Sequence, residues 1–177
     1  MYRKNANGEF LCGVLNDWDL SKLDGKDKES LFRTGTRAFL ALDFLQGKEV
    51  VHLERHDWES NFYVLVWIAT RCENGVEKET NALIRWGVFD EGANHDAKRS
   101  YLTSFATRPK VSSMFERLYR HWIDPLSMIF DQGYTAYDTA LRLENEPSPA
   151  ETETQFGKVT YEGLWAILKK DLPEPSA

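Results

Sequence analysis

The pattern of apolar and polar positions at the start of the chain predicts a β-hairpin. Two short strand-like runs, residues 2–4 and 9–15, are separated by the letters NANG. An Asn-Gly pair between two such runs is a strong hairpin signal, because both residues adopt the positive φ angles of a tight turn. Residues 16–37 are polar, charged and without periodicity, and we expect an exposed loop there.

The rest of the chain carries mainly helical patterns. The letters AFLALDFLQG predict a short helix that stops at Gly47. The run DWESNFYVLVWIATR is apolar enough for a buried strand or a buried helix. We favour a helix because Asp57 is a good N-cap and because Glu59 and Arg71 have the charges that suit its two ends.

Three amphipathic helices and a different kind of segment follow. Apolar residues three and four positions apart predict helices over residues 95–106, 112–123 and 125–143, the last with Pro125 in its first turn. Residues 144–158 are acidic, contain prolines and carry few large apolar groups, and they predict a mobile insert.

The chain ends in one more predicted helix, over residues 160–171, capped by Thr160 and with lysines near its C-terminal end. The fold class is therefore mainly α with a small N-terminal β-hairpin. We expect residues 1–177 to form a single domain.

Composition and charge exclude several classes of partner. The chain has 177 residues, 42% of them hydrophobic, which is sufficient for one core. Its formal net charge is -6 and its basic residues are scattered, so we expect no nucleic-acid partner. The longest apolar run, residues 62–69, is far shorter than the roughly 20 residues that span a bilayer, so we expect no membrane partner. Without a secretory signal we expect an intracellular, cytoplasmic protein; a nuclear location stays open.

Three short motifs in order point to a known family. Asp17-Trp18-Asp19 follows the predicted hairpin, the letters GTRAFLALD end at Asp43, and Asp57 opens the letters DWES. Together they resemble the activation segment and central helix of a protein kinase, and most closely the fungal-type protein kinase family. The likeness extends over residues 1–143 and implies a protein kinase-like C-terminal lobe, without the N-terminal lobe.

The resemblance implies a role for each motif. Asp17 would hold the Mg²⁺ that bridges the phosphates of ATP, and Trp18 would pack beneath it. Gly35 and Thr36 would position the substrate hydroxyl, and a threonine there is typical of kinases that modify Ser and Thr. Asp57 would support the catalytic loop by accepting its backbone N–H groups.

Asp43 stands where the common kinase motif has a glutamate. The resemblance implies that its carboxylate pairs with a buried arginine, for which Arg142 is the candidate. Being one methylene shorter than glutamate, it needs that arginine to approach more closely.

Simpler interpretations stand beside these roles. Asp57 also serves as an ordinary N-cap. Ser30, Thr34 and Thr36 are either phosphorylation sites or plain loop residues. Residues 55–57 contain the letters of the kinase catalytic loop in the wrong order. His52 and His56 have the spacing of a zinc-protease helix, but Leu53 stands where the general base belongs, so we expect no zinc site.

The parts of a kinase that perform the chemistry are absent from the sequence. It has no glycine-rich phosphate loop, no strand lysine followed by a helix glutamate, and no His-Arg-Asp loop. We therefore expect Met1 to be an internal methionine of a longer kinase, whose complete form uses Mg²⁺ and ATP. The chain alone would bind neither and would have no kinase activity.

Two functions from different classes remain open. The first is part of a fungal-type Ser/Thr kinase that phosphorylates a protein substrate, whose identity the sequence does not indicate. The second is an inactive kinase-like remnant that serves as a binding or scaffold module. The expected partner is the missing N-terminal lobe in the first case and another protein in the second.

Overall fold

The computed structural model describes residues 2–4, 10–13, 36–47 and 50–171. The chain divides into two units, residues 1–32 and 33–177, and each is considered by itself. In the first unit, strands β1 (Tyr2–Lys4) and β2 (Phe10–Gly13) pair antiparallel, with Tyr2 opposite Gly13. This confirms the predicted hairpin. The loop predicted over residues 16–37 lies almost entirely outside the described residues, and a single domain over 1–177 stays a prediction.

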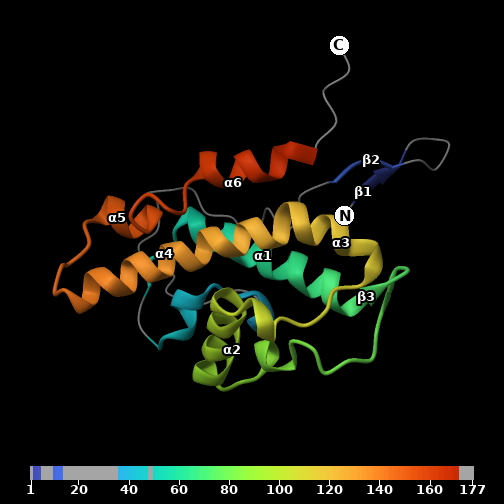
Figure 1. The fold of residues 1–177 in the computed structure, drawn as a ribbon, viewed down its shortest axis with the longest axis horizontal. Helices are drawn as coiled ribbons and strands as arrows, with labels where there is room; N and C mark the ends of the chain where they lie inside the picture. Colours follow the sequence, from blue (N-terminus) through green and yellow to red (C-terminus); the bar gives the residue numbers. More distant parts are fainter. Residues whose placement is uncertain (1, 5–9, 14–35, 48–49, 172–177) are drawn as a thin grey trace, which may run out of the picture. The chain divides into compact units, whose positions relative to one another are not determined.

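The second unit is mainly helical, as the sequence predicts (Figure 1). Its α-helices are α1 (Glu54–Arg71), α2 (Glu91–Thr103), α3 (Glu116–Leu118), α4 (Asp124–Arg142), α5 (Pro149–Thr154) and α6 (Tyr161–Leu168). Its 3-10 turns are η2 (Arg37–Phe39), η3 (Leu42–Leu45), η4 (Ile84–Gly87), η5 (Phe105–Thr107), η6 (Ser113–Phe115) and η8 (Lys169–Asp171), and η7 (Tyr119–Ile123) is a π-helix. Strands β3 (Cys72–Glu73) and β4 (Val76–Glu77) pair antiparallel and are joined by a two-residue turn.

Helix α1 forms where a helix was favoured over a strand, but it begins one turn earlier than predicted. Its first residue is Glu54, and Asp57 lies inside its first turn. The expectation that Asp57 is the N-cap is therefore wrong. The residue before the helix is Leu53, whose N–H is accepted by the His56 ring nitrogen Nδ1 at 3.1 Å. A ring nitrogen thus satisfies a free N–H at the helix start, a task usually performed by a Ser, Thr, Asp or Asn side chain.

The core of this unit is built from aromatic rings on α1, α2 and α4. Phe62 lies 5.4 Å from Phe130, and Tyr63 lies 5.0 Å from Trp86, between ring centroids. Trp86 also meets Tyr101 edge to face at 5.4 Å. Such pairs are worth about 0.5–1.5 kcal/mol beyond the area they bury. In Figure 1, α1 and α4 run side by side, and α6 packs along α4.

The segment predicted as one helix over residues 112–123 is divided into three short pieces, η6, α3 and η7. The π-helix η7 continues directly into α4, whose Pro125 lies in the first turn as predicted. A π turn holds one extra residue, which shifts the apolar face along the helix. Ile123 belongs to the core, and the adjacent Trp122 packs against it.

The acidic residues 144–158 contain a defined element. Ser148 caps α5, its hydroxyl accepting the N–H of Glu151, while the Glu151 carboxylate accepts the N–H of Ser148 at 2.9 Å. This capping box was not recognised because the segment carries few large apolar residues. Mobility of the insert stays a prediction. After it, Thr160 caps α6 by accepting the N–H of Gly163, which confirms the terminal helix.

Gly133 of α4 allows a test of how closely the acidic segment packs against this helix. A Cβ added there would collide with the buried side chain of Gln155 and would lie 2.8 Å from Val159 Cγ2. We expect Gly133→Ala to lower the free energy of unfolding by about 1–3 kcal/mol because a packed region must shift. Urea unfolding measures this. The control is Gly87→Ala, where nothing lies within 4 Å; equal stability of the two variants would contradict the close packing.

None of the helices in the described ranges is both long and apolar enough to cross a lipid bilayer.

Candidate functional site

The candidate site is the segment Thr36–Leu45, which carries η2 and η3, together with the side chains that hold it. Thr36 is exposed and immediately precedes η2, where its carbonyl accepts the N–H of Phe39 at 2.8 Å. Asp17, Trp18 and Gly35, to which the resemblance assigns metal binding, support and substrate positioning, lie outside the described residues. Their roles stay predictions.

Asp43 in η3 is held by two side chains from the first turn of α1. Its Oδ2 accepts from Arg55 Nη2 at 2.5 Å and from His56 Nε2 at 3.1 Å. The Arg55 side chain is 5% exposed and that of Asp43 17% exposed, so water screens this pair little. Because His56 Nδ1 accepts the N–H of Leu53, a neutral His56 ring carries its proton on Nε2 and donates it to Asp43.

The arginine paired with Asp43 is therefore Arg55, and the candidate Arg142 was wrong. Arg142 lies exposed in the last turn of α4. Arg55 follows Asp43 by only 12 residues, and the early start of α1 places it beside η3. Its Nε also donates to the carbonyl of Thr152 at 3.0 Å. One guanidinium thus connects η3, α1 and the acidic segment that contains α5.

The buried pair of Asp43 and Arg55 makes the free energy of unfolding depend on pH. Burial alone would raise the pKa of the Asp43 carboxyl, but the hydrogen bond from His56 and the charge of Arg55 lower it from 3.8 to about 2. A carboxyl whose pKa is lower in the folded state stabilises the protein above its unfolded pKa. That stability disappears as the pH falls through the folded pKa.

We therefore expect about 2 kcal/mol of the free energy of unfolding to be lost between about pH 4 and pH 2 because of this group. Urea unfolding at several pH values should show this slope in the wild type and a flatter one in Asp43→Asn. Asp96→Asn is the control, because that side chain is 78% exposed. A slope that is the same in Asp43→Asn and the wild type would refute the assignment.

Glu59 lies one turn beyond Arg55 and is fully enclosed, at 1% exposure. Its Oε1 accepts the backbone N–H of Leu42 at 3.0 Å and the Tyr63 hydroxyl at 2.7 Å, and its Oε2 accepts the Tyr134 hydroxyl at 2.7 Å. Burial raises the pKa of Glu59, although the hydrogen bonds from Tyr134, Tyr63 and Leu42 oppose that rise. This carboxylate therefore connects η3 with both α1 and α4.

Helix α2 holds the other side of the segment. The Lys98 ammonium donates to the carbonyl of Leu40 at 2.5 Å and lies 3.4 Å from that of Arg37. Asn94 Nδ2 donates to the carbonyl of Trp86 at 2.5 Å and also approaches the Arg37 carbonyl, at 3.4 Å. Helix α2 thus binds the carbonyls of Arg37 and Leu40, and Glu59 of α1 binds the N–H of Leu42.

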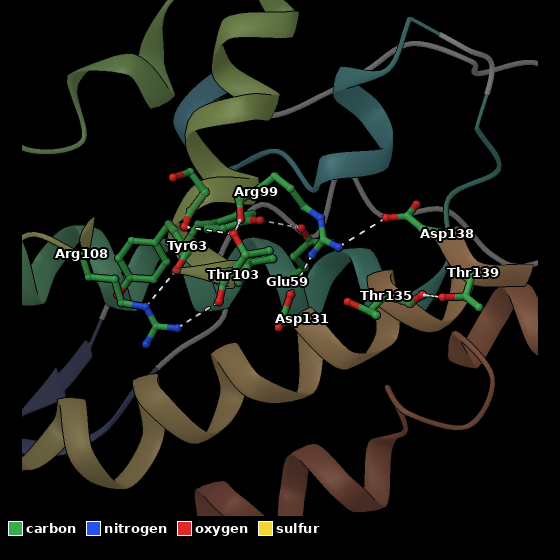
Figure 2. Close-up of polar contacts among 12 residues, drawn as sticks. Glu59, Tyr63, Arg99, Thr103, Arg108, Asp131, Thr135, Asp138 and Thr139 are labelled. Atoms are coloured by element: carbon green, nitrogen blue, oxygen red, sulfur yellow. Dashed lines mark hydrogen bonds and ion pairs between the residues drawn. The ribbon is translucent and has the colours of Figure 1, made fainter. Parts of the chain in front are cut away.

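The position of α2 is itself fixed by an arginine. Figure 2 shows Arg99 reaching from α2 toward α4, where it pairs with Asp131 at 3.0 Å and with Asp138 at 3.3 Å. Its guanidinium also lies 5.5 Å from the centre of the Tyr134 ring. The helix that supplies Lys98 is therefore tied to the helix that supplies Tyr134, so both sides of the segment belong to one packed unit.

Asp57 lies on the outer face of α1. Its side chain is 65% exposed and pairs with the exposed His52 at 3.0 Å. The residues exposed on this face are spaced three, four and seven positions apart, and they are Glu54, Asp57, Asn61 and Ile68. A support role for Asp57 stays a prediction.

No metal site is present in the parts of the second unit that the structure describes. Within residues 36–47 and 50–171, no three His, Cys, Asp or Glu side chains come together as a metal would require. His52 and His56 stack with their ring centroids 5.9 Å apart, but His56 is buried and engaged with Leu53 and Asp43. The absence of a zinc site at this pair stays a prediction.

Comparison with known proteins supports the kinase resemblance for part of the chain. Residues 1–69 match the family model described as "Fungal protein kinase". This confirms the resemblance over the three motifs and most of α1, whereas the likeness expected over residues 70–143 stays a prediction. No curated protein and no solved structure matches the chain.

Three of the residues that build the site were not recognised in the sequence: Arg55, Glu59 and Lys98. Arg55 was noticed only as part of a scrambled catalytic-loop motif, and His56 in that motif and in a histidine pair with zinc-protease spacing. Glu59 was interpreted as a favourable charge near a helix start. A charged side chain inside a helix that is apolar on most sides does carry a signal, because such a charge is rarely buried without partners.

Proposed function

We propose that this chain is the C-terminal-lobe part of a fungal-type Ser/Thr protein kinase domain. In the complete protein, the γ-phosphate of ATP would be transferred to a Ser or Thr hydroxyl of a protein substrate. The family match over residues 1–69 supports the kinase-like class, and the catalytic activity belongs to this proposal.

The observation that carries the proposal is the buried attachment of the segment that follows Thr36. Asp43 pairs with a buried arginine, as the resemblance requires, and Leu42 is bound by the buried Glu59. A substrate hydroxyl must be held in a fixed geometry for phosphoryl transfer, because positioning supplies much of the rate enhancement. A backbone fixed on both sides beside Gly35 and Thr36 would provide that floor.

The exposed face of α1 is a surface on which another part of a complete kinase would pack. Ile68 is 38% exposed there and Asp57 is 65% exposed at the side chain. A central helix with an open face suits a chain that packs against the missing N-terminal lobe and catalytic loop. Asp57 would then accept backbone N–H groups of that loop instead of pairing only with His52.

Magnesium bound together with ATP takes one or two carboxylates from the protein, besides the phosphates and water. Asp17 is the carboxylate expected for that role, and it lies outside the described residues. The part that this chain's described residues would play is therefore to hold the substrate segment in place.

The test uses the longest protein that the gene encodes, purified and supplied with labelled ATP, magnesium and peptide libraries. We expect phosphate to enter Ser and Thr peptides and not Tyr peptides, and we expect Asp17→Ala to abolish the reaction. Asp96→Asn, an exposed site on α2, is the matched control and should remain active. A folded protein that labels no Ser or Thr peptide would overturn the proposal and leave the scaffold function.

A further inference from the structure

Lys98 is the most unusual charged group among the described residues. Its side chain is 0% exposed, although lysine is rarely buried without a carboxylate in contact. Its hydrogen-bond partners in the described part of the chain are the carbonyls of Leu40 and Arg37. Its Nζ also lies 4.4 Å from the centre of the Tyr63 ring and 5.9 Å from that of Trp86.

Both kinds of contact depend on the charge of the amine. A protonated lysine has three donors, which here can point at two carbonyls and at the negative face of the Tyr63 ring. Charge-assisted hydrogen bonds are about twice as strong as neutral ones. A neutral amine would turn a lone pair toward an oxygen or toward the ring, and either arrangement is unfavourable. Losing the proton therefore weakens the hold of α2 on segment 37–42.

Among the described residues, the charge that acts on Lys98 comes from Glu59 of α1, which attracts its proton, and Tyr63 presents its ring. Asp43 and Arg55 act in turn on Glu59. Burial lowers the pKa of Lys98 from 10.5 to about 7, and the attraction of Glu59 opposes that fall.

We propose that Lys98 is a proton-controlled latch for segment 37–42: the protonated side chain holds the carbonyls of Arg37 and Leu40 against α2, and loss of the proton weakens that hold. The latch itself depends only on the fold. Its consequence, a substrate floor that loosens as the pH rises, rests on the proposed kinase function.

The test follows two signals in the same 177-residue chain. Nuclear magnetic resonance of isotope-labelled lysine reports the protonation of Lys98, which we expect to change with a midpoint at about pH 7. Hydrogen exchange of the Leu42 amide, corrected for its intrinsic pH dependence, should accelerate about tenfold from about pH 6 to pH 8, given the strength of a desolvated cation–π contact. The two midpoints should agree.

Variants separate Lys98 from the histidines near the segment. Lys98→Met should give fast exchange at both pH values, and Lys98→Arg, which stays charged, should give slow exchange at both. His52→Gln, which removes the exposed imidazole beside Phe44, should leave the midpoint unchanged.

Two results would overturn the latch. The first is a Lys98 signal that does not change between about pH 5 and pH 9. The second is a corrected exchange rate of the Leu42 amide that stays constant while Lys98 loses its proton. If both Lys98 variants fail to fold, the two wild-type signals still decide the question. Because neither signal involves kinase activity, failure of the latch would leave the proposed function standing.

Discussion

Replacing Glu59 with alanine is expected to lower the free energy of unfolding by about 3–5 kcal/mol. The change leaves the N–H of Leu42 and the hydroxyls of Tyr63 and Tyr134 without their shared acceptor in a site that water does not reach. It also removes the negative charge that attracts the proton of Lys98. Since domains of this size are stable by only about 5–15 kcal/mol, the variant should lose a large part of its stability.

Two variants control this experiment, which is read by urea unfolding monitored by circular dichroism. Glu59→Gln keeps the shape and one acceptor oxygen, and it should lose about half as much stability as Glu59→Ala. Glu54→Gln changes an exposed carboxylate on the same helix, one that accepts the Trp58 Nε1–H, and should lose less than about 0.5 kcal/mol. A Glu59→Ala variant as stable as Glu54→Gln would show that the buried carboxylate does not organise the site.

Breaking the buried pair between Asp43 and Arg55 should have an effect of similar size. Arg55→Met is expected to cost about 3–5 kcal/mol, because it leaves Asp43 without its cationic partner and the Thr152 carbonyl without its donor. A double-mutant cycle with Asp43→Asn isolates the pair itself, and we expect a coupling energy of about 2–3 kcal/mol. The size follows from the low exposure of both side chains.

The chain offers a matched exposed pair for comparison. Arg120 and Glu116 lie one helical turn apart at 3.0 Å, with side chains 72% and 50% exposed. Their coupling energy should be only about 0.3–0.5 kcal/mol, since water screens the charges and both side chains lose freedom. Equal coupling in the two cycles would mean that burial adds nothing to the Asp43 pair.

The sequence predicts the elements of this fold better than it predicts their ends. The run from Phe62 to Ala69 is too apolar for a surface helix, and it lies in α1 with Phe62, Tyr63, Val66 and Ala69 buried. The start of α1 was displaced by one turn because Asp57 has the stronger intrinsic preference for an N-cap. Contacts of His56 with Leu53 and Asp43, which involve a distant segment, decide the boundary instead.

The candidate site was predicted in part for a similar reason. The resemblance indicated that Asp43 needs a buried arginine, but several arginines were available and spacing alone could not choose Arg55. Lys98 lies on the amphipathic helix α2, where a lysine normally faces water. Only the packing of α2 against η2 and η3 reveals that its amine meets carbonyls. Burial of a polar residue is a property of the tertiary fold.

Composition alone did not predict the local structure of the acidic segment. Residues 144–158 have the charge and the proline content of a chain without fixed structure, yet Ser148 and Glu151 form a capping box there. The carbonyl of Thr152 then receives the Arg55 side chain. The capping box gives the segment its local structure, and the Arg55 hydrogen bond connects it to α1.

The central claim is that segment 37–45 is a fixed part of the fold, held by buried charges on α1 and α2. Hydrogen exchange of the Leu42 amide at about pH 6 tests it most directly, with the amide of Val66 in the middle of α1 as the reference. We expect Leu42 to exchange as slowly as Val66, because both should require global unfolding. Exchange of Leu42 as fast as that of an exposed loop amide such as Asn81, with Val66 still protected, would contradict the claim.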